Sequence, residues 1–330
     1  MRILIIKTSS LGDVIHTLPA LTDAGLQIPD IQFDWVLEPA FSEIPTFHPL
    51  VKNIILSPMR YFRRNFFQSF KNNELKNFYQ NLRKNNYDII IDAQGLIKSG
   101  LLTMLADGKV KCGYDRRSAW EPLACLAYNK SFNVNPLLHA ITRIRKLFAY
   151  SLQYPDPSDT RTPNYNINNH VLSMCKINSP QTNSNVVVFL HGTTRDDKRW
   201  PIKNWIKLKE LFLNKNKYKI LLPWGNESEK RDAVNIAAES NNNFIQVLPK
   251  SSIGELAKIL ATSKLNIAVD TGLGHLSAAL NQPTISLYGP TDPRLIGTIG
   301  ENQIHIKSDS QLMTDISPEK IMNESLNFLE

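Results

Sequence analysis

Short apolar runs alternate with helix-forming stretches in two series along this chain of 330 residues. The first series has expected strands at Arg2–Lys7, Phe33–Leu37, Lys52–Leu56 and Asp88–Asp92. Expected helices at Val14–Ala24 and Asn72–Asn85 lie between them. Strands that alternate with helices form parallel sheets with right-handed crossovers. The alternation therefore predicts an α/β fold.

The second series follows a polar gap. Residues 155–185 are rich in Pro, Asn, Ser and Thr, which is typical of an irregular connection. Strands are then expected at Val186–Leu190, Lys219–Leu222, Leu265–Val269 and Thr284–Tyr288, with helices at Ile202–Leu213 and Glu229–Ser240. We therefore predict two Rossmann-like domains facing a central cleft, 1–165 and 186–330, joined by a linker at 166–185. The terminal segment Pro318–Leu329 predicts an amphipathic helix that is free to pack on either domain, including back onto the first.

Composition limits the class of protein. Apolar residues make up 42% and charged residues 21%, as in globular proteins. The three cysteines are widely spaced, which argues against a disulfide framework or a zinc cluster. Only four apolar residues precede Lys7, and no run reaches the ~18 apolar residues of a membrane span. We expect a cytoplasmic protein without a bound metal or cofactor.

The net charge of +8 favours an anionic partner. Cations and aromatic rings alternate in the segment Arg60–Phe67, where the cations are Arg60, Arg63 and Arg64. Such a surface suits phosphates beside acyl chains, because guanidinium groups fork onto phosphate and aromatic rings prefer the membrane interface. Nucleic acid is an alternative partner, and a solvated amphipathic helix is the plain alternative.

A glycine-punctuated turn follows the apolar run that ends at Val269. Its residues are Asp270, Thr271, Gly272, Leu273, Gly274 and His275, and a helix-forming stretch comes next. The start of a helix offers free N–H groups at the positive end of the helix dipole, and glycine permits close approach. The turn predicts a phosphate site. An ordinary strand–helix loop is the alternative, and His275 is either catalytic or bonded to backbone.

Two further loops carry polar candidates at expected strand ends, where α/β sheets bind ligands. In the second domain Thr193, Thr194 and Lys198 are candidates for a diphosphate, and Glu229 for ribose hydroxyls. The alternatives are a solvated loop and a helix-start acid. In the first domain Asp13 is either a helix cap or a general base. Asp92, Gln94 and Lys98 are weaker candidates at another strand end.

Several well-known sites are absent from the sequence. It has no Gly-x-x-x-x-Gly-Lys-Ser/Thr loop, no Gly-x-Gly-x-x-Gly after the first strand, no Gly-x-Ser-x-Gly and no His-Glu-x-x-His. A nicotinamide-dependent oxidoreductase is therefore disfavoured. A sugar- or nucleotide-binding protein without catalysis is the second hypothesis.

Six blocks in order along the chain resemble the lipopolysaccharide heptosyltransferases of glycosyltransferase family 9. The blocks are Lys7–Ala20, Asp92–Leu96, Thr193–Lys198, Leu222–Gly225, Asp270–His275 and Leu287–Pro293. The block Thr193–Lys198 points to the first of the family's two heptose transfers more than to the second. The resemblance implies a GT-B fold and an inverting transfer of heptose from ADP-heptose to the Kdo of Kdo2-lipid A. It places the acceptor on the cytoplasmic face of the inner membrane. We therefore expect a peripheral protein there, a monomer with no nucleic-acid partner.

The resemblance also implies roles for residues. The position of Asp13 is the base of the family, and the threonines, Lys198 and Thr271–Gly274 match the diphosphate site. Glu229 and Asp270 match contacts to nucleotide and heptose. The expected acceptor contacts are Arg60, Arg63, Arg64, Gln94 and Lys98. One departure concerns the acceptor side, because Trp120 stands where the family often has arginine.

Overall fold

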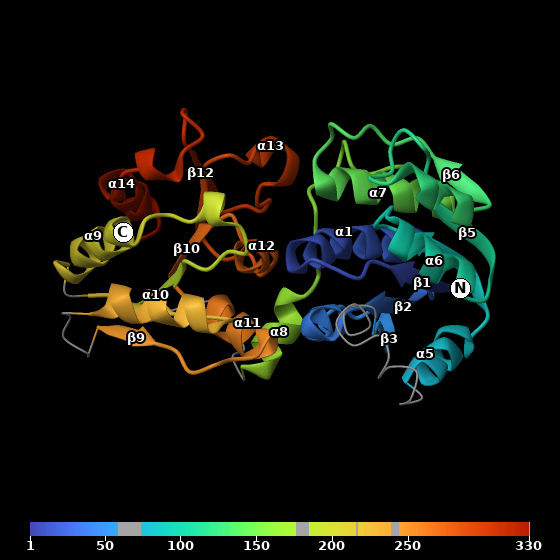
Figure 1. Cartoon of the computed structure of the whole chain (residues 1–330), viewed down its shortest axis with the longest axis horizontal. Helices are drawn as coiled ribbons and strands as arrows, with labels where there is room; N and C mark the ends of the chain where they lie inside the picture. Colours follow the sequence, from blue (N-terminus) through green and yellow to red (C-terminus); the bar gives the residue numbers. More distant parts are fainter. Residues whose placement is uncertain (59–73, 176–184, 216, 239–243, 330) are drawn as a thin grey trace. The chain divides into compact units, whose positions relative to one another are not determined.

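The chain folds into two compact units, Met1–Asn166 and Ile167–Glu330 (Figure 1). The computed structural model describes residues 1–58, 74–175, 185–215, 217–238 and 244–329. Each unit contains a six-stranded parallel sheet, with strand order β3-β2-β1-β4-β5-β6 in the first and β12-β11-β10-β7-β8-β9 in the second. Read in chain order, the two sheets have the same topology. The prediction of two Rossmann-like α/β sheets is confirmed.

The first unit has strands β1 (Arg2–Ile6), β2 (Gln32–Leu37), β3 (Val51–Leu56), β4 (Tyr87–Asp92), β5 (Gly108–Tyr114) and β6 (Lys130–Phe132). Its described helices are α1 (Leu11–Gln27), α2 (Glu43–Thr46), α5 (Glu74–Arg83), α6 (Ile97–Leu105) and α7 (Ala140–Leu152), with the 3-10 helices η1 (Pro39–Phe41) and η2 (Pro122–Ala127). Helices α1 and α7 pack together, while α6 packs on β1, β4 and α5.

Burial explains the apolar strand sequences. Residues Ile3, Leu4, Ile5 and Ile6 of β1 are fully buried, because a central parallel strand is covered by helices on both faces. A buried ion pair joins the helices on one face, where Arg145 of α7 lies 2.6 Å from a carboxylate oxygen of Asp23 of α1.

The second unit has strands β7 (Val186–Leu190), β8 (Lys219–Leu222), β9 (Ile245–Val247), β10 (Leu265–Val269), β11 (Thr284–Tyr288) and β12 (Gln303–Lys307). Its described helices are α8 (Asn168–Met174), α9 (Ile202–Leu213), α10 (Glu227–Ala237), α11 (Ile253–Thr262), α12 (Gly272–Ala279), α13 (Pro293–Ile296) and α14 (Pro318–Leu329), with the 3-10 helices η3 (Asp196–Lys198) and η4 (Met313–Asp315). The range predicted as a linker, 166–185, contains α8, which packs on α11.

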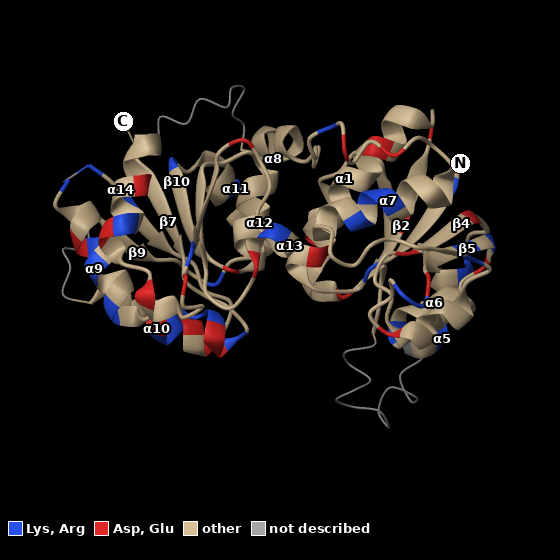
Figure 2. Cartoon of the chain, turned by 90° about the horizontal axis from the view of Figure 1, so that it is seen from above, with Lys and Arg blue, Asp and Glu red and all other residues tan. Residues whose placement is uncertain are grey.

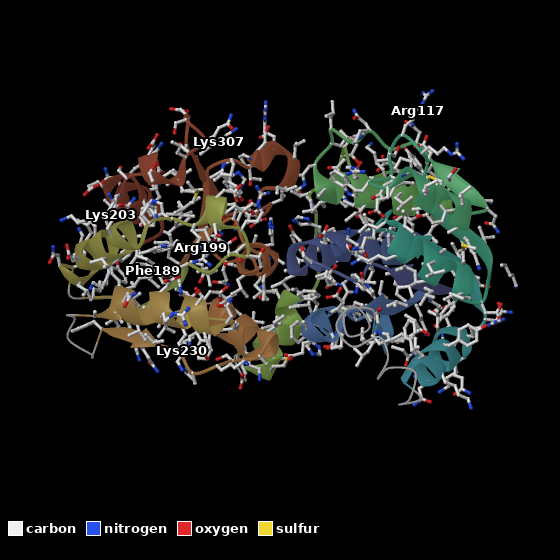
Figure 3. All side chains as sticks on the ribbon, in the orientation of Figure 1. Arg117, Phe189, Arg199, Lys203, Lys230 and Lys307 are labelled. Carbon is white, nitrogen blue, oxygen red and sulfur yellow. The ribbon has the colours of Figure 1, made fainter. Side chains whose placement is uncertain are left out.

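The terminal helix α14 belongs to the second unit. It packs on α9, β10 and β11, and its residues Ile321 and Leu329 are buried in a core built around Phe189 and Trp205. Figure 3 shows Phe189 among the packed side chains of this unit. The hydroxyl of Tyr218 donates to the backbone oxygen of Leu329 at 3.2 Å. Of the two placements left open by the sequence, the structure has the one on the second domain.

None of the described helices is both long enough and apolar enough to cross a membrane.

Candidate functional site

In each sheet the order of the strands reverses at one point, and the candidate residues lie at the carboxyl ends of the strands near that point. Strands β1 and β4 are neighbours in the first sheet, and β7 and β10 are neighbours in the second. The connections that leave such a pair run to opposite sides of the sheet, which opens a crevice beyond the carboxyl ends. The loops are joined in each unit: the backbone N–H of Thr8 donates to Gln94 at 2.9 Å, and the hydroxyl of Thr193 donates to the backbone oxygen of Asp270 at 3.3 Å.

Asp13 occupies the first turn of α1. Its Oδ2 accepts hydrogen bonds from the N–H of Ser10 at 2.9 Å and from the hydroxyl of Ser10 at 3.0 Å. Its Oδ1 lies 3.0 Å from the ammonium nitrogen of Lys7. The side chain of Asp13 is 43% exposed, whereas that of Lys7 is buried. Asp13 is thus not the N-cap residue, which is Ser10, but it takes part in the cap as the third helical residue of a capping box. Its carboxylate also faces solvent.

The surroundings of Asp13 hold it in the ionised form. Burial raises the pKa of Asp13. The charge of Lys7, the hydrogen bond from the Ser10 N–H and the charge of His16 together lower it by more than burial raises it. The pKa falls from an ordinary 3.8 to about 2. Asp13 is thus a carboxylate at neutral pH, able to accept a proton but a weak base.

Gln94 and Lys98 support the loop that leads to Asp13. The buried Gln94 amide oxygen accepts from the N–H of Thr8 at 2.9 Å and from its hydroxyl at 2.8 Å. Lys98 on α6 is partly exposed, and its Nζ lies 3.4 Å from the hydroxyl oxygen of Ser9 and 3.9 Å from a carboxylate oxygen of Glu38. Sequence reasoning missed Glu38, although an acidic residue directly after the strand at 33–37 was a usable signal.

Asp92 has a structural role. Its buried carboxylate accepts hydrogen bonds from the N–H groups of Gln94 and Gly95 at 2.8 and 3.0 Å, and from the Tyr128 hydroxyl at 2.7 Å. Burial raises the pKa of Asp92 in spite of these bonds. Gly95 has φ = +70°, a conformation that favours glycine. These contacts shape the turn that presents Gln94.

The start of α12 differs from the start of α6. In α6 a carboxylate oxygen of Glu121 accepts the N–H of Ile97 at 2.6 Å. In α12 the N-cap residue Thr271 makes no side-chain hydrogen bond to the helix start. Gly274 permits close packing of α12 on its strand, because an added Cβ would lie 3.1 Å from the Cβ of Ala268. The N–H groups of α12 are therefore the better anion site of the two.

A buried ion pair lies beside this helix start. The ammonium of Lys198, at the end of η3, is 2.6 Å from Oδ2 of Asp270. The two side chains are only 13% and 6% exposed. Thr193 is buried and bonded to the same turn, whereas Thr194 is exposed. The structure thus brings Thr193, Lys198 and Asp270 together.

Glu229 lies at the start of α10. Its carboxylate accepts from the N–H of Gly225 at 2.7 Å and from the side chain of Asn226 at 2.9 Å. Gly192 passes close by, since an added Cβ would lie 2.7 Å from Cδ of Glu229. His191, which sequence reasoning had left without a role, lies 3.0 Å from the backbone oxygen of Glu229 through Nε2. These contacts connect the loop after β7 with the one after β8.

The remaining candidates are His275, Trp120 and three arginines. His275 is buried in the first turn of α12. Trp120 is 69% exposed, and its ring lies 5.1 Å from the guanidinium carbon of Arg143. Three predicted acceptor residues lie outside the described residues: Arg60, Arg63 and Arg64.

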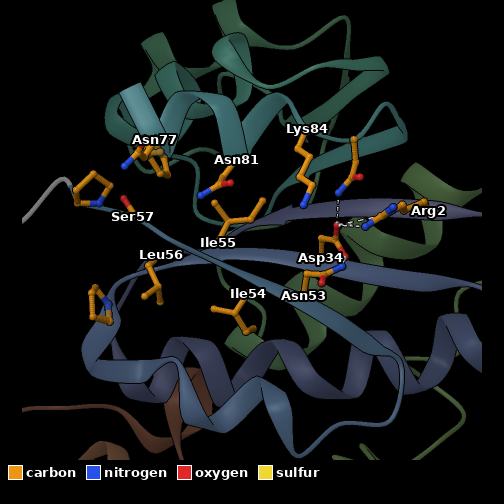
Figure 4. A pocket seen from close by; sticks show the side chains of 14 residues that line it. Arg2, Asp34, Asn53, Ile54, Ile55, Leu56, Ser57, Asn77, Asn81 and Lys84 are labelled. Carbon is orange, nitrogen blue, oxygen red and sulfur yellow. Dashed lines mark hydrogen bonds and ion pairs between the residues drawn. The ribbon is translucent and has the colours of Figure 1, made fainter. Parts of the chain in front are cut away.

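A cavity of about 720 Å³ lies beside β3 in the first unit, and its lining extends from Asn53 to Pro58 and includes Pro39, which follows Glu38 (Figure 4). Its wall includes the buried Asp34, which accepts hydrogen bonds from Arg2, Asn53 and Tyr87 at 2.8 to 2.9 Å. The protein itself thus satisfies this carboxylate. Arg2 begins β1 and Tyr87 begins β4, so this network lies at the amino ends of the strands, opposite the loop of Asp13.

Within the ranges that the structure describes, no three His, Cys, Asp or Glu side chains are grouped so that they could hold a metal ion.

Comparison with known proteins gives concordant matches. A family model described as glycosyltransferase family 9 (heptosyltransferase) matches residues 75–325. The chain is 44% identical over 325 residues to lipopolysaccharide heptosyltransferase 1 of Escherichia coli, covering 98% of this chain and 99% of the relative. It is 45% identical over 309 residues to the protein of the same name in Pseudomonas aeruginosa, covering 94% and 84%.

Solved structures agree with these matches. The structure described as E. coli heptosyltransferase WaaC with ADP superposes with a TM-score of 0.91 at 44% identity, over 99% of both chains. E. coli ADP-heptose lps heptosyltransferase II has a TM-score of 0.79 at 19% identity, over 100% of this chain and 98% of that one, and it supports the fold alone.

Proposed function

The chain belongs to glycosyltransferase family 9, the heptosyltransferases, and on that premise we propose that it transfers heptose from ADP-heptose to the Kdo of Kdo2-lipid A. One observation carries this proposal: similarity to lipopolysaccharide heptosyltransferase 1 extends over 98% of the chain and thus through both units. Two similar structures were solved with ADP and with ADP-2-deoxy-2-fluoro heptose, which supports ADP-heptose as donor.

The second unit is proposed to bind the donor. The N–H groups at the start of α12 bind the diphosphate. The residues that form this start are Thr271, Gly272, Leu273 and Gly274, and the buried His275 follows them in the first turn. Lys198 supplies a positive charge, and its ion pair with Asp270 keeps it at this turn. Thr194 adds a hydroxyl donor, and Thr193, whose hydroxyl donates to the backbone oxygen of Asp270, offers its oxygen as an acceptor and its N–H as a donor. Glu229 and Asp270 take hydroxyls of ribose and heptose.

The first unit is proposed to supply the base. The acceptor oxygen attacks the anomeric carbon, the bond from that carbon to the diphosphate oxygen breaks, and ADP leaves with the electron pair. The hydroxyl proton passes to the Asp13 carboxylate. A base with a pKa of about 2 acts late, once attack has made the hydroxyl acidic. A single displacement inverts the anomeric centre, and stabilisation of the departing diphosphate by N–H groups and Lys198 lowers the barrier.

The acceptor is proposed to bind the first unit. Lys98 is partly exposed beside Ser9 and can pair with a carboxylate of Kdo, while Gln94 acts on the acceptor through the loop that it holds. The sequence adds Arg60, Arg63 and Arg64. We further propose a monomer, without a nucleic-acid partner, that works peripherally at the cytoplasmic face of the inner membrane.

Incubation with ADP-heptose and Kdo2-lipid A tests the proposal. Mass spectrometry of the lipid should show the addition of one heptose, and ADP should appear only when both substrates are present. ADP-heptose binding without transfer would support the alternative of a binding protein and contradict the proposal.

A further inference from the structure

An exposed apolar surface lies on α6 and on the segment that includes η2. Six large side chains, each 47% to 69% exposed, form it: Ile97, Leu101, Met104, Trp120, Leu123 and Leu126. We call this surface the α6–η2 patch. Single exposed apolar residues are ordinary on proteins, whereas a contiguous set is typical of an interaction site.

The two parts of the patch adjoin each other. Helix α6 packs on η2 at Gly100, where an added Cβ would lie 3.2 Å from the backbone oxygen of Ala124. On α6 the exposed residues 97, 101 and 104 follow the spacing of one helix face, and Met104 is one turn beyond Gly100. On η2, Leu123 and Leu126 are three residues apart and share a face of the 3-10 helix. The apolar side chains therefore form one surface.

The chain segment that carries the patch has an excess of positive charge. From residue 96 to 130 the chain has six Lys or Arg against three Asp or Glu. Lys109 and Arg117 are exposed, and Figure 3 shows Arg117 extending away from the ribbon. Figure 2 shows cationic positions on β5, which follows α6. One of the three acids, Glu121, already accepts the N–H of Ile97 and thus compensates the helix dipole.

We propose that the α6–η2 patch docks on a bilayer that contains anionic lipids, with its apolar side chains at the boundary between head groups and acyl chains. The proposal rests on the proposed function, because it places a lipid acceptor at the same surface. The ammonium of Lys111 donates to the backbone oxygen of Met104 at 2.8 Å, so at least one cation adjoins the apolar patch, and cations beside apolar side chains match anionic head groups. Trp120 is a ring of the kind that prefers the membrane interface, and it is backed by the guanidinium of Arg143.

Two further observations favour a bilayer. Helix α6 also carries Lys98, whose Nζ is 3.4 Å from the hydroxyl oxygen of Ser9 in the loop that leads to Asp13. The docking helix would therefore adjoin the loop where a lipid-borne sugar must react. A symmetric contact with a second copy would place like charges opposite each other, which disfavours a dimer through this patch.

Vesicle binding tests the proposal with the full chain. The variant Leu101→Gln/Met104→Gln/Leu126→Gln is compared with a control in which three equally exposed apolar residues elsewhere are changed: Leu26→Gln, Val234→Gln and Leu312→Gln. The first variant should bind vesicles of phosphatidylglycerol and phosphatidylcholine at least roughly tenfold more weakly than the wild type. The control variant should bind like the wild type. The three side chains replaced in each variant are exposed in the wild type, so both variants should keep the wild-type Tm.

Three results would overturn the proposal: a patch variant that binds vesicles normally, equal binding of the wild type to pure phosphatidylcholine, or a wild-type dimer in ultracentrifugation that only the patch variant loses. The assay contains neither sugar substrate. Failure of heptose transfer would therefore refute the proposed function and leave the vesicle result intact. Kinetics give a second readout, since the KM for Kdo2-lipid A in vesicles should rise while that for a deacylated Kdo acceptor stays unchanged.

Discussion

Each unit has a lysine–aspartate pair at the carboxyl ends of its central strands, but the pairs are built differently. Lys7 lies in the loop after β1 and Asp13, six residues further on, in the first turn of α1, and the aspartate is 43% exposed. Lys198 and Asp270 join two loops, and both side chains are nearly buried. In the first unit the pair presents a carboxylate to solvent, whereas in the second it neutralises one.

The helix starts differ in the same sense. A carboxylate of Glu121 caps α6, which leaves little attraction for an added anion. In α12 the side chain of the N-cap residue Thr271 makes no capping hydrogen bond. One sheet topology therefore supports two chemistries: the first unit is suited to accept a proton and the second to bind a diphosphate.

The largest effect is expected from removal of the exposed carboxylate. Asp13→Asn should lower kcat by about 10²–10⁴-fold, because the amide accepts no proton from the acceptor hydroxyl. The Kd for ADP should stay close to that of the wild type.

A matched variant separates the base from the cap. In Asp13→Asn the side-chain oxygen can still accept the N–H of Ser10, whereas Asp13→Ala loses that bond. Both variants should be inactive, and both lose the ion pair with the buried Lys7, so both should have a lower Tm than the wild type, the alanine variant the lower of the two. Substantial turnover by a folded asparagine variant would assign Asp13 to the cap alone and remove the contrast between the units.

The second effect concerns the buried pair. Lys198→Met should weaken ADP binding by roughly ten- to a hundredfold in calorimetry, as for loss of a bond to a charged group. It should also destabilise the protein by about 3–5 kcal/mol, because it leaves the Asp270 carboxylate buried without its cation.

The double variant Lys198→Met/Asp270→Asn is the control for stability. It removes both charges, so its Tm should recover while ADP binding stays weak. Normal ADP affinity in either variant would mean that the pair serves the fold only.

A smaller effect is expected from Lys7→Gln. The positive charge of Lys7 lowers the pKa of Asp13, whereas burial raises it. Without that charge the pKa should rise from about 2. A depressed carboxylate pKa contributes stability above the unfolded value near 3.8 and loses it as the pH falls through about 2. Because Asp13 stays ionised from pH 7 to pH 5, its titration should cause no loss of wild-type kcat/KM in that range. In the variant, the acid limb of the kcat/KM profile should move to higher pH. A limb at the same pH in both proteins would rule out Asp13 as the titrating base.

The smallest effect is expected from chelation. If N–H groups and Lys198 hold the diphosphate, EDTA should leave the Kd for ADP unchanged. Repeating the titration with added Mg²⁺ provides the control. A large loss of affinity with EDTA would indicate a metal bridging the phosphates, and the account of the second unit would need a further component.

Most of the sheet could be predicted from the sequence. The ranges predicted for β7, β10 and α9 agree with the structure to the residue, because buried parallel strands and amphipathic helices have strong local patterns. The predicted helix at 14 begins three residues earlier, at Leu11, since Ser10 and Asp13 form a cap. This shift puts Asp13 inside the first turn.

Other elements could not be predicted. The sequence pattern predicts no strand or helix between residue 100 and the polar gap at 155–185, yet β5, β6 and α7 lie there. In α7 the arginine Arg145 is buried, which breaks the expected apolar face, and it is stabilised by Asp23 of α1. A pair separated by 122 residues has no local signal. For the same reason, nothing in the sequence indicated that Gln94 holds the N–H of Thr8.

The parallel α/β class, the two series of strands and the residues gathered at their carboxyl ends can be derived from sequence, since they depend on periodicity and on turn chemistry within a few residues. How those residues pair depends on the three-dimensional arrangement of the strands. Lys198 meets Asp270, 72 positions further along the chain, because β7 and β10 are neighbours in the sheet. The difference between the starts of α6 and α12 depends on the fold that brings Glu121 back to the N–H of Ile97. Charge pairing over such separations is set by strand order, which no local pattern encodes.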